Sequence, residues 1–172
     1  MAKEKNFTRG PRIRSGGQTG IDRAALDAAV LTGRPYEGWC PKGGWAEDFL
    51  RPPGLLTIYP HLMETPSESP ERRTDWNVRD SAATVVFVPD SKYSSRGTDF
   101  TIECAKKYGK PYCIIHYMDR GAIIDARPLV RQPSTASWPR RTRPCAGCRV
   151  RFNAPLRGCG GLKVSGLRDG RG

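Results

Sequence analysis

Three short apolar runs in the first two thirds of the chain have the pattern of β-strands. Thr84–Val88 is mainly apolar and rich in β-branched residues, and this pattern predicts a central strand covered on both faces. Pro111–Ile115 predicts a second buried strand. Pro11–Ser15 predicts a third and weaker strand, because Arg12 and Arg14 interrupt its apolar pattern.

Three longer segments have the features of helices. They are Ile21–Leu31, Pro70–Ser81 and Thr98–Tyr108. Gly33 and Gly109 follow the first and third segments, where a glycine favours the end of a helix. Thr19 precedes the first segment and, with Asp22 three residues later, has the spacing of a helix cap. Pro70 suits the first turn of a helix, so the second segment begins there.

The order of these elements indicates the class of fold. A strand, a glycine loop and a helix precede a second strand, glycine loop and helix and a last strand, which predicts a Rossmann-like, doubly wound parallel α/β sheet. We assign residues 11–127 to this single domain and residues 1–10 to a flexible N-terminus. Residues 34–65 are rich in proline and glycine and are expected to be mostly irregular. Residues 128–172 show no sustained periodicity, so we expect a disordered tail.

The positive charge of the chain is concentrated in this tail. The net charge is +12, yet residues 1–127 carry 19 Lys/Arg and 16 Asp/Glu, whereas residues 128–172 carry 10 Lys/Arg and one acid, Asp169. Two hypotheses remain open: the tail is a basic arm that binds nucleic acid through phosphate contacts, or it is translated in a shifted reading frame. The near-neutral body argues against nucleic acid as the partner of the domain itself.

The segment from Ser15 to Arg23 joins a predicted strand to the start of a helix. Glycines let a ligand approach the backbone, and the unpaired N–H groups at a helix start suit a phosphate. The candidate phosphate-binding residues are Ser15, Gly16, Gly17, Gln18, Thr19, Gly20, Asp22 and Arg23. The segment matches neither the G-x-G-x-x-G fingerprint nor the P-loop, and an ordinary tight turn before a capped helix is the alternative.

A second glycine loop, Ser94–Thr98, follows the strongest predicted strand and begins a helix. Loops that follow the carboxyl ends of parallel strands meet at one edge of the sheet, where α/β proteins bind ligands. We therefore expect Gly97 and Thr98 to line one crevice with Gly17 and Thr19, after adjacent strands. A serine-rich surface loop without a ligand is the alternative.

Five blocks of the sequence carry a resemblance to a known family. They are SGGQTGIDRAALDAA, GWCPKG, AED, RTDWNVRDSAAT and SRGTDFTIECAKKYGKP, and they extend from about Arg14 to Pro111. These blocks resemble the putative molybdenum carrier family of the SLOG superfamily, which also includes the LOG-type, "lysine decarboxylase-like" nucleotide hydrolases. The resemblance implies a phosphate-bearing ligand of nucleotide or pterin type, with the molybdenum cofactor as one candidate. It adds Lys42, Arg73 and Asn77 to the candidate ligand-binding residues.

The same resemblance implies a position for catalysis. LOG-type hydrolases carry a Gly-Thr-x-x-Glu signature, whose Glu takes part in cleaving an N-glycosidic bond. Here Gly97 and Thr98 are followed by Thr101 at the position of that Glu, so Thr101 joins the candidate ligand-binding residues. Glu103 lies two residues further, about 200° around the helix, and is not expected to substitute. The sequence favours binding without catalysis, and a nucleoside-monophosphate hydrolase is the alternative.

The six cysteines do not form a pattern that supplies all the ligands of a metal site. Cys104 and Cys113 fall in apolar stretches and are expected in the core. Cys40 is either a structural thiol or a ligand to a soft metal. The tail offers three cysteines, two of them at zinc-knuckle spacing, whereas a structural zinc site needs four ligands.

No segment predicts a membrane span or secretion. The longest mainly apolar run, residues 82–88, is far shorter than the roughly 20 residues that cross a bilayer. Lys3 and Lys5 are not followed by the apolar stretch of a signal peptide. We therefore expect a cytoplasmic protein whose partner is a small molecule, and association with copies of itself remains open.

Overall fold

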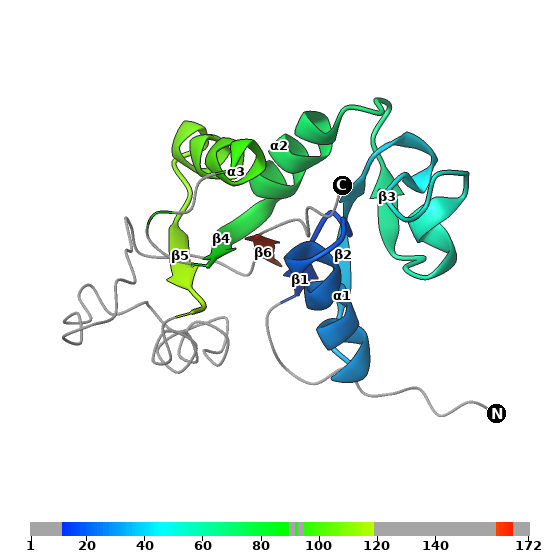
Figure 1. The fold of residues 1–172 in the computed structure, drawn as a ribbon, viewed down its shortest axis with the longest axis horizontal. Coiled ribbons are helices and arrows are strands. Elements are labelled where there is room, and N and C mark those ends of the chain that lie inside the picture. The colour runs from blue at the N-terminus through cyan, green and yellow to red at the C-terminus, as the bar shows by residue number, and fades with distance from the viewer. Residues whose placement is uncertain (1–11, 90–91, 93–94, 119–160, 167–172) are drawn as a thin grey trace.

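The structure, a computed structural model, describes residues 12–89, 92, 95–118 and 161–166. Within these residues, six parallel strands form one sheet in the order β3-β2-β1-β6-β4-β5 (Figure 1). The strands are β1 (Ile13–Arg14), β2 (Tyr36–Cys40), β3 (Leu62–Glu64), β4 (Ser81–Val88), β5 (Tyr112–His116) and β6 (Gly161–Gly166). From β1 the chain moves outward through β2 and β3, and from β4 it moves outward in the opposite direction to β5.

Three α-helices connect the strands. They are α1 (Ile21–Leu31), α2 (Pro70–Asp80) and α3 (Arg96–Lys107), and two short 3-10 helices, η1 (Lys42–Gly44) and η2 (Gly54–Thr57), lie between β2 and β3. α1 packs against β1, β2 and β6, whereas α2 and α3 pack against each other and against β4 and β6. Figure 1 shows the α2–α3 pair apart from α1. The predicted α/β fold, with parallel strands that alternate with helices, is confirmed.

The two ends of α1 differ in how well the sequence predicted them. Gly33 has a φ of 64° and its N–H bonds to the carbonyl of Val30 at 3.2 Å, which confirms the predicted helix end. The predicted cap by Thr19 is wrong, because Gly20 holds the N-cap position with a φ of 83° and no side chain caps the helix. The Thr19 hydroxyl instead donates to the carboxylate of Glu47.

Residues 34–65 are mostly irregular, as expected, but they also contain two strands, β2 and β3, that the sequence did not predict. Gly38 occupies the middle of β2, where a Cβ atom would lie 2.0 Å from the carbonyl oxygen of Ser15. Gly38 weakens the strand pattern in the sequence, yet it is the residue that allows β2 to lie so close to the backbone of Ser15, directly after β1. β3 has three residues, too few to show a strand pattern.

The strand β6 departs furthest from the sequence-based expectation. We expected no regular structure in residues 128–172, yet Gly161–Gly166 forms a strand between β1 and β4 (Figure 1). Its Leu162 is in register with both Ile13 on β1 and Ala83 on β4. A strand of six residues whose partners are so distant in the chain carries little local signal, and its backbone finds those partners only in the folded sheet.

Other expectations concern parts of the chain that the structure does not describe. Residues 1–10 and the tail cysteines Cys145, Cys148 and Cys159 fall in these parts. Most of residues 128–172, the segment to which the nucleic-acid and reading-frame hypotheses apply, also falls in these parts. In the described ranges, no helix has the length and apolar character needed to cross a membrane.

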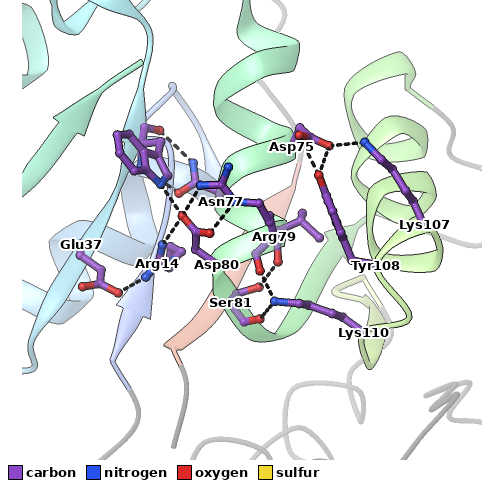
Figure 2. Close-up of polar contacts among 12 residues, drawn as sticks. Arg14, Glu37, Asp75, Asn77, Arg79, Asp80, Ser81, Lys107, Tyr108 and Lys110 are labelled. Carbon is purple, nitrogen blue, oxygen red and sulfur yellow. Dashed lines mark hydrogen bonds and ion pairs between the residues drawn. The ribbon is translucent and has the colours of Figure 1, made fainter. Parts of the chain in front are cut away.

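The arginines that weaken the first predicted strand have an acidic partner on the next strand. Arg12 donates to one carboxylate oxygen of Glu37 on β2 at 2.6 Å. Arg14 contacts the other oxygen, as Figure 2 shows. Arg14 also lies 3.5 Å from the carboxylate of Asp80, at the end of α2. The charges flanking Ile13 are therefore neutralised across the strand pair, which stabilises β1 in spite of its weak apolar pattern.

Side chains directed at the backbone fix α2 between β2 and β4 (Figure 2). Asn77 forms two hydrogen bonds of 2.8 Å with the backbone N–H and carbonyl of Trp39 on β2. Lys110 donates to the carbonyls of Arg79 and Ser81, where α2 ends and β4 begins. These contacts fix the place of α2 relative to the sheet.

Candidate functional site

A cavity of about 830 Å³ lies where three segments leave the carboxyl ends of strands. The first segment follows β1 and leads into α1, the second follows β3 and leads into α2, and the third follows β4 and leads into α3. The volume falls in the range of small-molecule sites, roughly 300–1,000 Å³. The direction of the chain along the sheet also reverses between β1 and β4, and α/β proteins bind ligands at such a reversal.

Three helix N-termini converge on this cavity. The helices α1, α2 and α3 have 11, 11 and 12 residues, and each contributes first-turn residues to the lining. The first backbone N–H groups of a helix have no partner within it, and the helix start carries a partial positive charge. These partial charges suit an anion, although four carboxylate side chains, those of Asp22, Glu71, Asp99 and Glu103, share the same lining.

The two glycine loops border the same cavity, but the strands that precede them are not neighbours. Thr19 lines the cavity together with Gly97 and Thr98, whereas Gly17 does not. Because β6 lies between β1 and β4, the expectation of adjacent strands is wrong. The intervening strand sets β1 and β4 about 10 Å apart, and this separation leaves room for a ligand between the loops.

A buried ion pair joins α1 to α2 at the wall of the cavity. Nη1 of Arg73 lies 2.8 Å from Oδ2 of Asp22, and the two side chains are only 5% and 7% exposed. Gly16 lies directly against this arginine, since a Cβ at Gly16 would be 2.1 Å from Nη1. Glycine is therefore required for the guanidinium to lie against the loop backbone, and the ion pair fixes the first turns of both helices relative to each other.

Hydroxyl groups line much of the cavity, and several already donate within the protein. Thr74 and Thr101 donate to backbone carbonyls one turn earlier, at 3.1 and 2.9 Å. Ser95 caps α3 by accepting the N–H of Thr98 at 3.2 Å, and its own hydroxyl donates to the Thr98 oxygen at 2.9 Å. Because the Thr98 oxygen is the acceptor in that bond, its O–H proton can be donated to a ligand.

A strap, residues 45–48, lies along the first glycine loop and is held by side chains of that loop. Nε2 of Gln18 donates to the carbonyl of Trp45 at 3.0 Å. Thr19 donates to Glu47. The strap therefore fixes the orientation of two residues that line the cavity.

Arg23 extends the same attachment. Its two terminal nitrogens each bond to Asp48 at 2.9 Å, and its Nε donates to the carbonyl of Gly17 at 2.8 Å. These hydrogen bonds hold the pKa of Asp48 below its ordinary value, so the pair is formed above the usual carboxyl pKa and is lost as the pH falls through the lowered value. Arg23 is thus directed at the strap and at the ring of Phe49, whose centroid is 5.3 Å away.

Half of the predicted ligand-binding residues are brought together at the cavity. Those that line it are Gln18, Thr19, Asp22, Arg73, Gly97, Thr98 and Thr101. Those that lie outside the lining are Ser15, Gly16, Gly17, Gly20, Arg23, Lys42 and Asn77. Several of the second group support the site from behind: the buried Ser15 hydroxyl donates to the Asp22 carbonyl at 2.8 Å, and Gly17 has a φ of 69° and leaves no room for a side chain, since a Cβ there would lie 3.0 Å from Leu55.

Some lining residues were not among those predicted from the sequence. Glu71 and Thr74 lie three residues apart in the first turns of α2, and this spacing on one helix face was an available signal. Phe100 adds an aromatic ring to the wall. Glu103, which is not expected to replace the Glu of LOG-type hydrolases, also lines the cavity, because the lining extends over more than one face of α3.

The cysteines of the described ranges are buried thiols. Cys40, Cys104 and Cys113 are all buried and unbridged. Burial raises the pKa of the Cys40 thiol to about 11, and its sulfur donates to the carbonyl of Met63 at 3.4 Å. A thiol that stays protonated is a poor metal ligand, so these contacts favour the structural alternative for Cys40. Among the residues described, no group of three or more His, Cys, Asp or Glu side chains is placed to hold a metal ion.

Comparisons with known proteins agree with the fold. Residues 13–143 match the model of the circularly permutated YpsA SLOG family. A solved structure of a putative molybdenum carrier protein from Syntrophus aciditrophicus SB is similar to this chain, with 31% sequence identity and a TM-score of 0.65. This similarity covers 94% of this chain and 86% of that chain. No curated protein matches the chain significantly.

The fold is that of a Rossmann-like α/β protein with a cavity at the reversal of strand order. The chain belongs to the circularly permutated YpsA SLOG family. The resemblance of the chain to the putative molybdenum carrier family is confirmed by its similarity to the Syntrophus structure.

Proposed function

We propose that the cavity binds a phosphate-bearing small molecule of the nucleotide or pterin type, and that the protein holds this ligand without altering it. The convergence of three helix N-termini on one cavity carries the proposal. The N–H groups of these helices and the Thr98 hydroxyl are donors suited to a phosphate. The volume of about 830 Å³ leaves room for the rest of such a ligand, and the ring of Phe100 offers an apolar wall.

The molybdenum cofactor is one ligand of this class, and the name of the similar Syntrophus protein makes it a candidate. The donors in the cavity fit the phosphate of its pterin, because helix N-termini and hydroxyls bind oxyanions. The buried thiol of Cys40 does not line the cavity and is not placed to contact a metal there. In this proposal the chain would hold the cofactor through its phosphate.

A nucleoside-monophosphate hydrolase is a second candidate, because Glu103 lines the cavity and is exposed to it. A carboxylate near the ligand could activate water or stabilise developing positive charge on a sugar. The position that carries Glu in LOG-type hydrolases is Thr101 here, and its hydroxyl donates to the carbonyl of Gly97 at 2.9 Å. We therefore favour binding.

Incubation of the protein with adenosine monophosphate is expected to release no free adenine above the uncatalysed rate. General acid–base help is worth roughly 10²–10⁴ in rate, and Thr101 has no acidity that could supply it near neutral pH. Liquid chromatography of the released base provides the measurement. If the base is released, and if Glu103→Gln abolishes the release while Glu64→Gln on the distant strand β3 does not, the hydrolase replaces the binding protein as the conclusion.

The substitution Thr98→Val is expected to weaken the binding of inorganic phosphate by roughly 10- to 100-fold. Valine preserves the shape of the side chain but removes the hydroxyl, and a hydrogen bond to a charged group contributes about 1.5–3 kcal/mol. Isothermal titration calorimetry measures the affinity, with Thr57→Val as the matched control because Thr57 is exposed in η2 and lies outside the cavity. Equal affinities for the wild type and Thr98→Val would remove Thr98 from the phosphate site.

A further inference from the structure

Gln18 is a buried polar side chain at the cavity, and only the nitrogen of its amide has a hydrogen-bond partner. The residue is 1% exposed and belongs to the cavity lining. Its Nε2 donates to the carbonyl of Trp45 at 3.0 Å, whereas its Oε1 is buried and accepts no hydrogen bond in the described part of the chain. A buried acceptor that has lost its water without gaining a donor is unfavourable, and such groups commonly mark a place where a ligand binds.

The strap fixes which end of this amide remains available. Rotating the amide by 180° would set Oε1 against the carbonyl oxygen of Trp45, so that two acceptors would face each other. Trp45 cannot easily move away, because Glu47 and Asp48 tie the same strap to the glycine loop through Thr19 and Arg23. Gln18 therefore offers the ligand an acceptor, and its donor is already in use.

We infer that Gln18 does not contact the phosphate but recognises a hydrogen-bond donor, a hydroxyl or an N–H group, on the part of the ligand beside the phosphate. Phosphate oxygens are acceptors at neutral pH, and an acceptor placed against them is repulsive. A sugar hydroxyl or an amino group of a heterocyclic ring would satisfy Oε1. This inference rests on the proposed function, and it makes Gln18 a specificity-determining residue of the same site.

The test uses pairs of probes that differ by one donor and the full-length protein. Inorganic phosphate, adenosine monophosphate, its 2′-deoxy and 3′-deoxy analogues and purine riboside monophosphate are titrated by calorimetry. The deoxy analogues lack a sugar hydroxyl, and purine riboside monophosphate lacks the amino group of the base. For the wild type, we expect at least one pair to differ about 5-fold or more in affinity, which is the effect of leaving one buried acceptor unpaired.

The variant Gln18→Met is expected to reduce that preference to less than about 2-fold and to leave the affinity for inorganic phosphate unchanged. Lys106→Met, an exposed residue of α3 outside the lining, is the matched control and should retain the wild-type preference. If Gln18→Met does not fold, Gln18→Asn takes its place: it keeps an amide but withdraws the oxygen by one methylene, and it should also reduce the preference to less than about 2-fold.

Two results would overturn the inference while the proposed function stands. One is that the wild type binds phosphate and adenosine monophosphate but distinguishes no pair. The other is that Gln18→Met weakens inorganic phosphate and the nucleotide equally, or leaves the preference intact. If the wild type binds none of the probes, the proposed function itself is wrong, and the inference fails with it.

Discussion

Replacing Val164 by proline is expected to destabilise the protein by roughly 2–4 kcal/mol, the largest effect that we expect outside the cavity. Val164 lies in the middle of β6, in register with Val85 of β4, and β6 has a neighbouring strand on each side. Proline has no N–H to donate, and its ring does not fit within a central strand. The loss therefore follows from the backbone alone.

Urea denaturation followed by circular dichroism measures this loss as a lower midpoint of unfolding. The control Val164→Ile keeps both the N–H and the β-branched side chain and should change the midpoint little. If the proline variant unfolds at the wild-type urea concentration, residues 161–166 do not belong to the sheet.

The substitution Arg73→Met is expected to cost roughly 3–5 kcal/mol of stability and to abolish binding of inorganic phosphate. The Asp22 side chain is 7% exposed, and removing its arginine leaves a carboxylate in a nearly dry position. That negative charge would also face any anion in the cavity, because Asp22 lines it. Stability and affinity should therefore fall together.

The neighbouring arginine provides a matched control for this prediction. Arg72 is exposed on the same helix, so Arg72→Met should change stability by less than about 1 kcal/mol. The double variant Arg73→Met with Asp22→Asn should regain part of the lost stability, because it no longer buries an uncompensated charge. Additive effects of the two substitutions would show that the buried pair is not coupled.

The elements that the sequence predicted are those whose signals are local. Helix α2 begins at Pro70, and α1 and α3 are followed by Gly33 and Gly109, as expected from residues next to each helix. The strand β4 has a continuous run of β-branched and apolar residues that needs no distant partner to be recognised.

The elements that were missed depend on contacts between distant residues. In β2, Gly38 is required because the carbonyl of Ser15 comes so close, and nothing near Gly38 in the sequence indicates that approach. The strand β6 depends on β1 and β4, because its backbone pairs with both of them in the sheet. Local patterns contain neither fact, so a glycine and a short run of mixed residues look like irregular chain.

The candidate site divides in the same way. The glycine loops were predictable because a strand, a loop and a helix start are local features that suit a phosphate. The direction of each side chain was not. Arg23 has the position and charge of a phosphate ligand, yet Asp48, 25 residues later, holds it away from the cavity.

The central place of β6 also has a consequence for the order in which the protein can be built. The ribosome completes β1 to β5 first, and about 45 further residues must follow β5 before β6 emerges. At 5–20 residues per second this interval lasts roughly 2–9 s. During it the two parts of the sheet, β3-β2-β1 and β4-β5, cannot be joined, because β6, which pairs with the inner strand of each part, is still missing. Completion of the native sheet is therefore a late event of synthesis, and a chain that stops before residue 161 lacks the strand that joins the two sides of the cavity.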